Sequence, residues 1–433
     1  MGLNKQLTII FLCLYSSIGL IYSSTTPPQG DEIHFLIIIQ SITQDRDLFL
    51  ENNYQNKDYL TFTDQPIENH SVSGRNSHEV SIHDPGLPAL LSPAYLLLKK
   101  TGITITLSFI SALLISKIYS LCLYVTPNTQ ASLLTSIALG LSLPFIQYSF
   151  LIFTEIVAAY FLISLVLSYL KDDYSATSIL VSLFILPWLN IRYAPISAVL
   201  AILITLKHKG PKPLFTLVFS GALFLLFLKY SYLSFLPTTR YQLFHVATSG
   251  GNILVNIINV LIDRQYGLLI YSPIFICTFI GSIFLYKTNK KYFRISLFLT
   301  ALYILPILQF SEWNGGYNPP PARYIVPILP LLSPYIALFL VKRPLAGNVF
   351  FAFSTAWGLL LFILGVSTSP NHGFVYKDGH SVALSKLSSY FELNLGSIFP
   401  AYYPNQTTSP DHFILIFMLI ILSVGLYLSP NDK

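Results

Sequence analysis

Long apolar runs limit what this chain can fold into more than any other feature of its sequence. Several runs are long enough to cross a lipid bilayer as helices, which takes about 20 residues each. Charged side chains supply only 10% of the 433 residues, whereas soluble domains carry about 25%. The mean hydropathy of +0.61 agrees with this pattern. We therefore predict an all-α membrane protein.

About twelve membrane crossings are expected from the apolar runs. The first, Leu7–Tyr22, is interpreted as a retained span, since the Ser-Ser-Thr-Thr that follows is a poor cleavage site for a signal peptide. Residues 85–98 are apolar but too short to cross, and we expect an interfacial or re-entrant helix there. The run 178–206 is broken by Pro187 and Pro195 and is interpreted as two helices or half-helices. The remaining expected spans are 103–124, 131–145, 149–170, 214–235, 267–286, 295–310, 324–341, 349–366 and 413–428.

The basic residues of the short connections predict how these spans are oriented. Cytoplasmic loops carry an excess of Lys and Arg, so the side that holds these residues is assigned to the cytoplasm. The longer connections then lie outside, and they include the most polar stretch, 23–84. The basic residues are Lys171, Lys207, Lys209, Lys212, Lys287, Lys290, Lys291, Arg294, Lys342, Arg343 and Lys433, and the external connections are 23–100, 236–266, 311–323 and 367–411.

Four segments follow from this topology. Residues 1–24 form the first transmembrane helix, and 25–100 form a large external loop with interfacial helices. Residues 101–366 form a transmembrane helix bundle, and 367–433 hold an external loop and the last transmembrane helix. No cytoplasmic connection is long enough for a nucleotide-binding domain, and no phosphate-binding glycine loop is present. We expect no ATP hydrolysis. We also expect no nucleic-acid partner, because most of the basic residues behind the net charge of +6 lie in short loops.

Two adjacent carboxylates follow the first span, in the sequence Gly30-Asp31-Glu32-Ile33-His34. They open a segment, 33–49, with helix-like apolar spacing. If Asp31 begins that helix, Asp31 and His34 lie on one face and Glu32 points about a quarter-turn away. A purely structural interpretation is open too: Asp31 caps the helix, and Glu32 is a favourable first-turn charge.

Ionised side chains inside or at the ends of spans are costly, and are therefore candidates for function. Glu155 is expected about two turns inside its span, and Arg192 lies between Pro187 and Pro195. Both are placed toward the outer leaflet, where they either pair with each other or contact a substrate. Arg240 and Arg264 bracket one external connection and are further candidates.

A second external connection runs from Glu312 to Arg323. Its Trp313 and Tyr317 offer flat faces for a sugar ring. Its glycines allow close approach of the backbone, and its prolines stiffen the part of the connection that leads back to the membrane. Arg323 is expected where the chain re-enters the membrane, at the depth of a lipid phosphate, which its planar fork suits. The alternative is that these are ordinary interfacial anchor residues.

Several of these motifs occur in an order that resembles a known family. The segment from Gly30 to Leu48 comes first, followed by His83-Asp84-Pro85-Gly86-Leu87-Pro88. Tyr148-Ser149, Thr154-Glu155-Ile156, Arg192-Tyr193-Ala194 and Pro321-Ala322-Arg323-Tyr324 follow downstream. Together they resemble the GT-C superfamily of polytopic membrane glycosyltransferases. The resemblance is to the branch with protein O-mannosyltransferases, the aminoarabinose transferase of lipid A and related lipopolysaccharide sugar transferases. The motifs span residues 1 to about 340.

The resemblance implies a transfer reaction at the outer membrane face. A sugar would move, with inversion, from a polyprenyl-phosphate donor to a hydroxyl acceptor on a lipid, glycan or protein. Asp31, with Glu32 beside it, would be the catalytic carboxylate, and Arg323 with Arg192, Arg240 or Arg264 would stabilise the phosphate. The substrate-binding set would be His34, His83, Asp84, Glu155, Arg192, Arg240, Arg264, Trp313, Tyr317 and Arg323.

No nucleotide or other cofactor is required by this reaction. Cys13, Cys122 and Cys277 lie in apolar runs without CxxC spacing, so the sequence predicts no metal site from them. His83-Asp84 replaces the branch's usual His-aromatic pair, however, and this leaves a divalent metal open. The resemblance implies a bacterial inner-membrane protein whose active site faces the periplasm. A lipid or solute transporter without catalytic activity is the alternative, since a broken helix suits transport as well.

Overall fold

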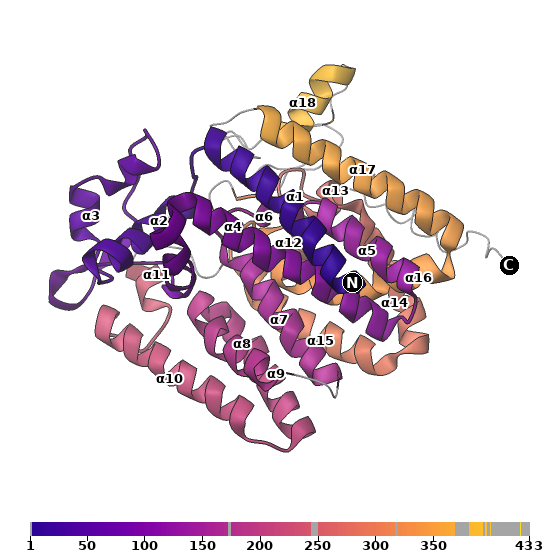
Figure 1. Ribbon diagram of the computed structural model, residues 1–433, viewed down its shortest axis with the longest axis horizontal. Helices are drawn as coiled ribbons and strands as arrows, with labels where there is room; N and C mark the ends of the chain where they lie inside the picture. The colour runs from indigo at the N-terminus through magenta and orange to yellow at the C-terminus, as the bar shows by residue number, and fades with distance from the viewer. Residues whose placement is uncertain are drawn as a thin grey trace.

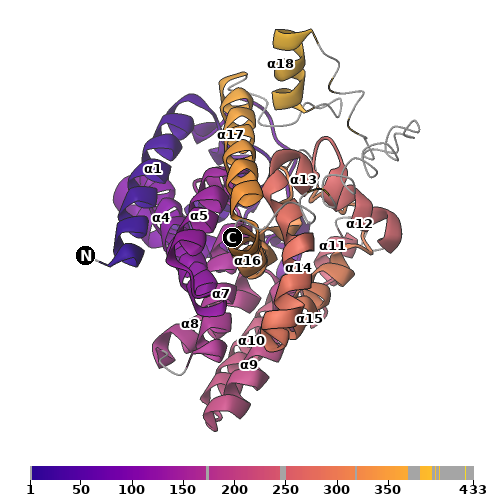
Figure 2. The same ribbon diagram turned by 90° about the vertical axis from the view of Figure 1, so that its right-hand side faces the viewer.

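Helices build almost all of the protein (Figures 1 and 2). The computed structural model describes residues 2–171, 175–243, 250–316, 319–368 and 381–392, with residues 395, 399 and 425. The expected span 413–428 and the side chain of Tyr317 therefore lie outside the described residues. Six described helical segments are long and apolar enough to cross a membrane: Leu3–Thr25, Gly86–Val125, Ile191–His208, Lys212–Tyr232, Arg323–Lys342 and Pro344–Ser367.

These six helices make the chain a multi-pass membrane protein, while the number twelve stays a prediction. Five further apolar helices are 10–17 residues long, which is short for an upright crossing. The expected span 267–286 illustrates why some of these helices are short. It is divided into α13 (Leu268–Tyr271), a 3₁₀ turn and α14 (Ile276–Thr288). Pro273 lies at the break, where proline offers no N–H for the helical ladder.

The N-terminal helices pack along one another. Helix α1 (Leu3–Thr25) lies against α4 (Gly86–Val125) (Figure 1). Helix α4 joins the expected interfacial segment 85–98 and the expected span 103–124 into one element with a kink at Leu98–Lys99. Gly102 is needed at this kink, because a Cβ there would lie 2.2 Å from the carbonyl oxygen of Ala94.

Helix α2 (Asp31–Gln40) begins at Asp31, as predicted, but is shorter than the expected 33–49 segment. It continues as a π-helical turn, Ser41–Asp45, and ends where Arg46 takes a left-handed conformation with a φ of 64°. The stretch that the sequence predicts to be external then adds α3 (Glu51–Gln55), 3₁₀ turns at Asp58–Thr61 and Arg75–Ser77, and strands β1 (Ser71–Ser73) and β2 (Glu79–Ser81).

Strands β1 and β2 form an antiparallel hairpin in which Val72 pairs with Val80. The hairpin packs on the end of α10 (Lys212–Tyr232) through a small apolar core that includes Val72, Val80 and Phe224. Gly74 permits the contact, since a Cβ there would lie 2.1 Å from the carbonyl oxygen of Ser231. The hairpin is thereby fixed beside the end of the bundle that carries α11.

The central helices confirm the predicted break between 178 and 206. Helix α8 (Ala176–Leu189) and helix α9 (Ala194–His208) meet at a 3₁₀ turn, η4 (Ile191–Tyr193), that holds Arg192. The predicted depth of Glu155 is wrong: it lies in the first turn of α7 (Thr154–Leu170), because residues 149–153 leave the helical conformation. The other helices of this region are α5 (Thr129–Leu141), α6 (Phe145–Tyr148) and α11 (Thr239–Leu243).

The C-terminal helices close the bundle. The expected span 324–341 consists of the 3₁₀ helix η6 (Arg323–Leu332), which contains Pro327 and Pro330, followed by α16 (Ser333–Lys342). The remaining elements are α12 (Ile253–Ile262), η5 (Pro273–Phe275), α15 (Lys290–Ile307), α17 (Pro344–Thr368) and α18 (Val382–Phe391). Helix α7 packs against η6, and an ion pair between Glu155 and Arg323 joins the first turns of both elements.

Candidate active site

Four charged side chains from four elements form one ion-pair network. Nη2 of Arg323 lies 2.5 Å from Oδ2 of Asp31, and its Nε lies 3.0 Å from Oε1 of Glu155. The same Oε1 lies 2.5 Å from Nη2 of Arg192. Two carboxylates alternate with two guanidiniums, so the formal charge of the network is zero. Glu155 and Arg192 thus pair, as one of the two sequence interpretations had it, and Arg323 links that pair to Asp31.

Arg323 is held by contacts on every side of its guanidinium. Its Nη1 donates to the carbonyl oxygen of Gly315 at 2.6 Å, and its Cζ lies 4.6 Å from the centre of the Phe153 ring. Gly315 has a φ of +107°, and a Cβ there would lie 2.8 Å from Cδ of Arg323. A larger residue at 315 would therefore displace the arginine.

Aromatic and hydroxyl side chains surround the second arginine. Nη2 of Arg192 also donates to the hydroxyl of Tyr193 at 3.0 Å, and its Cζ lies 4.6 Å from the ring centre of Tyr324. The hydroxyl of Thr154 lies 3.1 Å from that of Tyr193. Sequence reasoning named these three residues only within the motifs that resemble a known family and did not include them among the candidate site residues, because a Tyr or Thr at the end of a span carries little functional signal of its own.

Asp31 does not cap its helix. Gly30 occupies the N-cap position with a φ of 52°, and no side chain caps the first turn. The capping interpretation is therefore wrong for Asp31, whose carboxylate faces Arg323. Burial alone would raise the pKa of Asp31, but the charge of Arg323, the neighbouring histidines and the hydrogen bond from Arg323 together hold it well below its usual range. Asp31 is ionised at neutral pH.

Glu32 points away from Asp31, as the helical spacing predicts. Its Oε1 accepts the Ile152 N–H at 3.0 Å, and its Oε2 accepts the Gln29 N–H at 3.2 Å. Burial raises the pKa of Glu32. The bond from Ile152 ties the start of α2 to the chain just before α7, and the bond from Gln29 is local. Glu32 therefore positions the elements that carry Asp31 and Glu155.

Three imidazoles lie next to Asp31. Nε2 of His83 is 4.0 Å from Oδ1 of Asp31 and 3.1 Å from Nδ1 of His70. The ring of His34 stacks on that of His70 with centroids 3.7 Å apart, and Nδ1 of His34 lies 3.1 Å from the Tyr54 hydroxyl. Burial lowers the pKa of His83 to about 4 and also lowers the pKa values of His34 and His70. All three rings are neutral at pH 7.

Sequence reasoning missed His70. It lies in the polar external stretch, and no spacing relates it to His83. The pairing of β1 with β2 brings the two residues together, because His70 precedes β1 and His83 follows β2, and both lie at the open end of the hairpin. Two histidines on either side of a short hairpin were the one signal that could have suggested their contact.

Asp84 and Arg240 form a separate, fully buried pair. Nη1 and Nη2 of Arg240 donate to the two oxygens of Asp84 at 2.7 and 2.9 Å. This bidentate pair joins the chain before α4 to α11. It lies outside the network of Arg323 and fixes the external stretch. Arg264 lies just after α12, where its carbonyl oxygen accepts the hydroxyl of Tyr271 at 2.7 Å.

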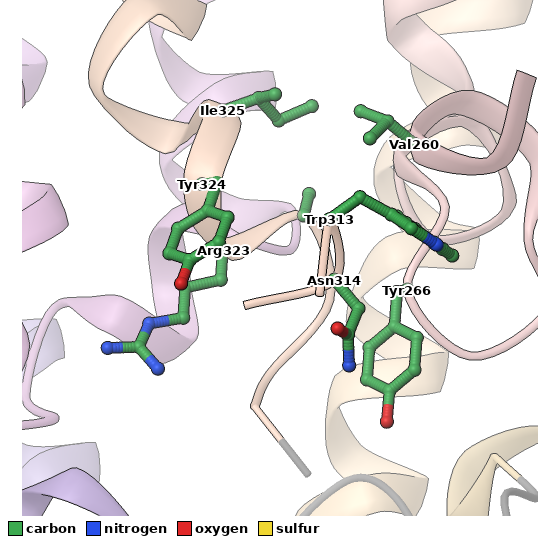
Figure 3. A pocket seen from close by; sticks show the side chains of 8 residues that line it. Val260, Tyr266, Trp313, Asn314, Arg323, Tyr324 and Ile325 are labelled. Carbon is green, nitrogen blue, oxygen red and sulfur yellow. The ribbon is translucent and has the colours of Figure 1, made fainter. Parts of the chain in front are cut away.

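Trp313 is buried, with only 5% of its surface exposed. Its ring meets that of Tyr266 edge-on at 6.1 Å. Figure 3 shows these two residues on one side of a small pocket and Arg323 and Tyr324 on the other. Within the described structure Trp313 therefore serves as a wall of this pocket, and its ring is packed against a neighbour.

A larger apolar cavity of about 500 Å³ adjoins this pocket. Val260 and Ile325 line both spaces, so the two share these residues as a wall. Figure 3 shows Val260 and Ile325 facing each other at one end of the small pocket. The other lining side chains are almost all aliphatic or aromatic and come from α12, α14, α15, η6 and the segments between them. They include Leu261, Leu269, Phe279, Leu297, Ile304 and Leu329.

Comparisons with known proteins place this arrangement beside three solved structures. No family model matches the sequence, and no curated protein matches it. The chain is similar in structure to ArnT from Cupriavidus metallidurans bound to undecaprenyl phosphate, with 10% identity and a TM-score of 0.47 over 97% of this chain and 76% of that one. It is also similar to the oligosaccharyltransferase AglB from Archaeoglobus fulgidus in complex with an inhibitory peptide and a dolichol-phosphate, with 12% identity and a TM-score of 0.44.

The third structure is the apo form of an Archaeoglobus fulgidus oligosaccharyltransferase, with 12% identity and a TM-score of 0.42. This chain is covered almost completely in each comparison, but it spans only 61% and 60% of the two archaeal chains.

Proposed function

We propose that this protein is a membrane glycosyltransferase that moves a sugar from a polyprenyl-phosphate donor to a hydroxyl acceptor. The observation that carries the proposal is the position of Arg323. Its guanidinium contacts the carboxylate of Asp31, and its side chain lines a pocket that shares a wall with the apolar cavity. A cation, a carboxylate and an apolar space thus lie side by side.

A lipid phosphate suits these three parts. The apolar cavity would take the first isoprene units, since its lining offers no charged group. The phosphate would bind Arg323, whose planar fork matches phosphate oxygens. Arg192 lies on the far side of Glu155 and would add positive charge as the leaving group develops its own negative charge.

The chemistry is a single displacement. The acceptor oxygen forms a new bond to the anomeric carbon of the sugar, while the bond from that carbon to the donor phosphate breaks. The bonding electrons leave with polyprenyl phosphate, and the acceptor proton passes to Asp31. Because attack and departure occur on opposite sides, the anomeric configuration is inverted.

Arg323 also gives Asp31 a way to become a stronger base. Paired with Arg323, the carboxylate has a depressed pKa and accepts protons poorly. A donor phosphate competes with Asp31 for the same guanidinium. When the phosphate takes Nη2 of Arg323, Asp31 loses part of its counter-charge and its pKa rises. A general base works best when its pKa lies near the ambient pH, so donor binding prepares the base.

Purified protein tested against a panel of radiolabelled polyprenyl-phosphate sugars would check the proposal. The assay follows release of polyprenyl phosphate and transfer of label to hydroxyl acceptors. Transfer that depends on both Asp31 and Arg323 is the expected result. Binding or movement of the lipid with no cleavage of the sugar-phosphate bond would instead indicate a transporter.

A further inference from the structure

The cluster next to Asp31 has the composition of a metal site. Oδ1 of Asp31, Nδ1 of His70 and Nε2 of His83 all lie within 4.8 Å of one another. Two imidazoles and one carboxylate are a ligand set that transition-metal ions bind in proteins, whereas Mg²⁺ and Ca²⁺ prefer oxygen ligands. We propose that Asp31, His70 and His83 bind one divalent transition-metal ion, with Zn²⁺ as the best match.

The distances fit this assignment. Zn–N and Zn–O bonds of about 2.0–2.1 Å in a tetrahedron place neighbouring ligand atoms roughly 3.3–3.4 Å apart. The two imidazole nitrogens are 3.1 Å apart, and the carboxylate oxygen is 4.0 Å from His83. All three ligand atoms lie within 4.8 Å of one another, so an ion bound between them would draw the Asp31 carboxylate closer to the two histidines. Its other oxygen, Oδ2, is the one that accepts from Arg323, so Oδ1 is turned to the histidines.

Backbone structure already holds the two histidines in place. The β1–β2 hairpin fixes their separation, and the Ile82 N–H donates to the carbonyl oxygen of His70 at 3.0 Å. The Tyr54 hydroxyl accepts the His70 N–H at 3.1 Å and contacts His34, which stacks on the His70 ring. Such supporting contacts orient metal-binding histidines in proteins.

The site keeps a position open for a further ligand. The side chains of Asp31 and His83 are 20% and 15% exposed, so solvent reaches the cluster. An ion bound there would have three protein ligands and at least one exchangeable position, as catalytic zinc sites do. A water molecule or an acceptor hydroxyl would fill that position. Oδ1 of Asp31 would then bind the ion, and Oδ2, which accepts from Arg323, would remain the oxygen that takes the acceptor proton.

Zinc binding to the untagged, chelator-treated full-length protein tests this inference. Metal content is measured by mass spectrometry after equilibration with Zn²⁺, and affinity by competition with a chromophoric chelator. One zinc ion per chain is expected. His70→Gln and His83→Gln should each weaken binding by more than the 10–100-fold that losing a supporting contact costs. His78→Gln is the matched control, since His78 pairs with Glu51 elsewhere on the external stretch.

The binding assay needs neither donor nor acceptor, so its outcome is independent of the proposed transfer reaction. Circular dichroism and thermal melting establish that each variant is folded. If a histidine variant does not fold, Asp31→Asn supplies the same comparison. Failure of the wild-type protein to bind zinc with a micromolar or tighter Kd overturns the inference. So does equal zinc affinity in the wild-type, His70→Gln and His83→Gln proteins.

Discussion

Arg323 donates to Asp31 across 292 residues of sequence. The contact joins the first turn of α2 to the first residue of η6, and Glu155 accepts from the same guanidinium. One side chain therefore connects the carboxylate of Asp31, the buried acid of α7 and, through that acid, Arg192. Four of our predictions concern this network and the histidines beside it, and a fifth concerns the orientation of the chain.

Replacing Arg323 should reveal whether charge or shape matters at this position. Arg323 donates in three directions, to Asp31, Glu155 and the carbonyl of Gly315. Arg323→Lys keeps the charge but loses the planar fork, so we expect partial loss of transfer and a raised KM for the lipid donor. Arg323→Ala should lose about 10²–10³-fold in kcat, the range for removing a group that stabilises developing charge. Normal transfer by both variants would make Arg323 a membrane anchor only.

Glu155 should matter for stability. It is fully buried between Arg192 and Arg323. Glu155→Gln leaves two guanidiniums near each other with less counter-charge, and removing one partner of a buried ion pair costs about 3–5 kcal/mol. Glu51→Gln is the control, since the pair of Glu51 and His78 is partly exposed and such pairs contribute about 1 kcal/mol or less. Thermal melting in detergent should show a clear drop for Glu155→Gln and little change for Glu51→Gln.

The sequence predicted the local parts of this site well. Apolar spacing correctly predicted a helix after Gly30, and Glu32 is turned away from Asp31 as expected for a helix that begins at Asp31. The prolines around Arg192 correctly predicted two helices meeting there, and the cost of burying charge correctly suggested the pairing of Arg192 with Glu155. Each of these inferences depends on residues close in sequence or on a general cost of burial.

What the sequence did not predict depends on tertiary contacts. The contact of Arg323 with Asp31 joins two distant segments, and no local pattern specifies it. The hairpin partner His70 lies in a polar stretch without periodicity. The helix start before Glu155 was missed because the chain leaves the helix at 149–153 without a proline or glycine in those residues. Helix α7 packs against η6, and no pattern in the local sequence specifies this tertiary contact.

The histidines should make the metal-free protein sensitive to acid. Burial is the main reason that the pKa of His83 falls from 6.5 to about 4, and Arg323 and Arg240 lower it further against the opposing effect of Asp31. The unfolded chain therefore takes up a proton below pH 6.5 that the folded chain does not. This contribution destabilises the fold progressively between pH 6.5 and about 4, by up to roughly 1.4 kcal/mol per pH unit.

His83→Gln should remove this part of the pH dependence. The melting temperature of the variant should fall less than that of the wild-type protein between pH 7 and 4.5, with both samples treated with chelator. Parallel melting curves for the wild-type protein and His83→Gln would contradict the assignment of a neutral, buried His83.

The orientation in the membrane can be tested by cysteine labelling. In a background with Cys13, Cys122 and Cys277 replaced by serine, single cysteines are placed at Lys57 and at Asn289. The basic connections predict that position 57 faces outside and position 289 faces the cytoplasm. An impermeant reagent on intact cells should therefore label Lys57→Cys and spare Asn289→Cys. The reverse pattern would invert the topology and move the proposed active site to the cytoplasmic face.

Measuring turnover and stability separately distinguishes a catalytic role of Asp31 from a structural one. Asp31→Asn keeps the size of the side chain and a hydrogen-bond acceptor for Arg323, but it cannot take the proton of the acceptor. Losing a general base typically costs about 10²–10⁴-fold in rate, so transfer should fall by that factor while the protein still folds and inserts. Glu32→Gln should keep most of the activity, since Glu32 contacts backbone N–H groups away from Arg323.

Asp31→Ala provides the matched comparison. It removes the base together with the partner of Arg323, so we expect it to lose activity like Asp31→Asn and to melt at a lower temperature as well. Turnover and melting temperature measured for Asp31→Asn, Asp31→Ala and Glu32→Gln distinguish base from structural partner. An Asp31→Asn enzyme with normal turnover would show that the carboxylate only holds Arg323 in place. A larger loss of turnover in Glu32→Gln than in Asp31→Asn would transfer the role of the base to Glu32.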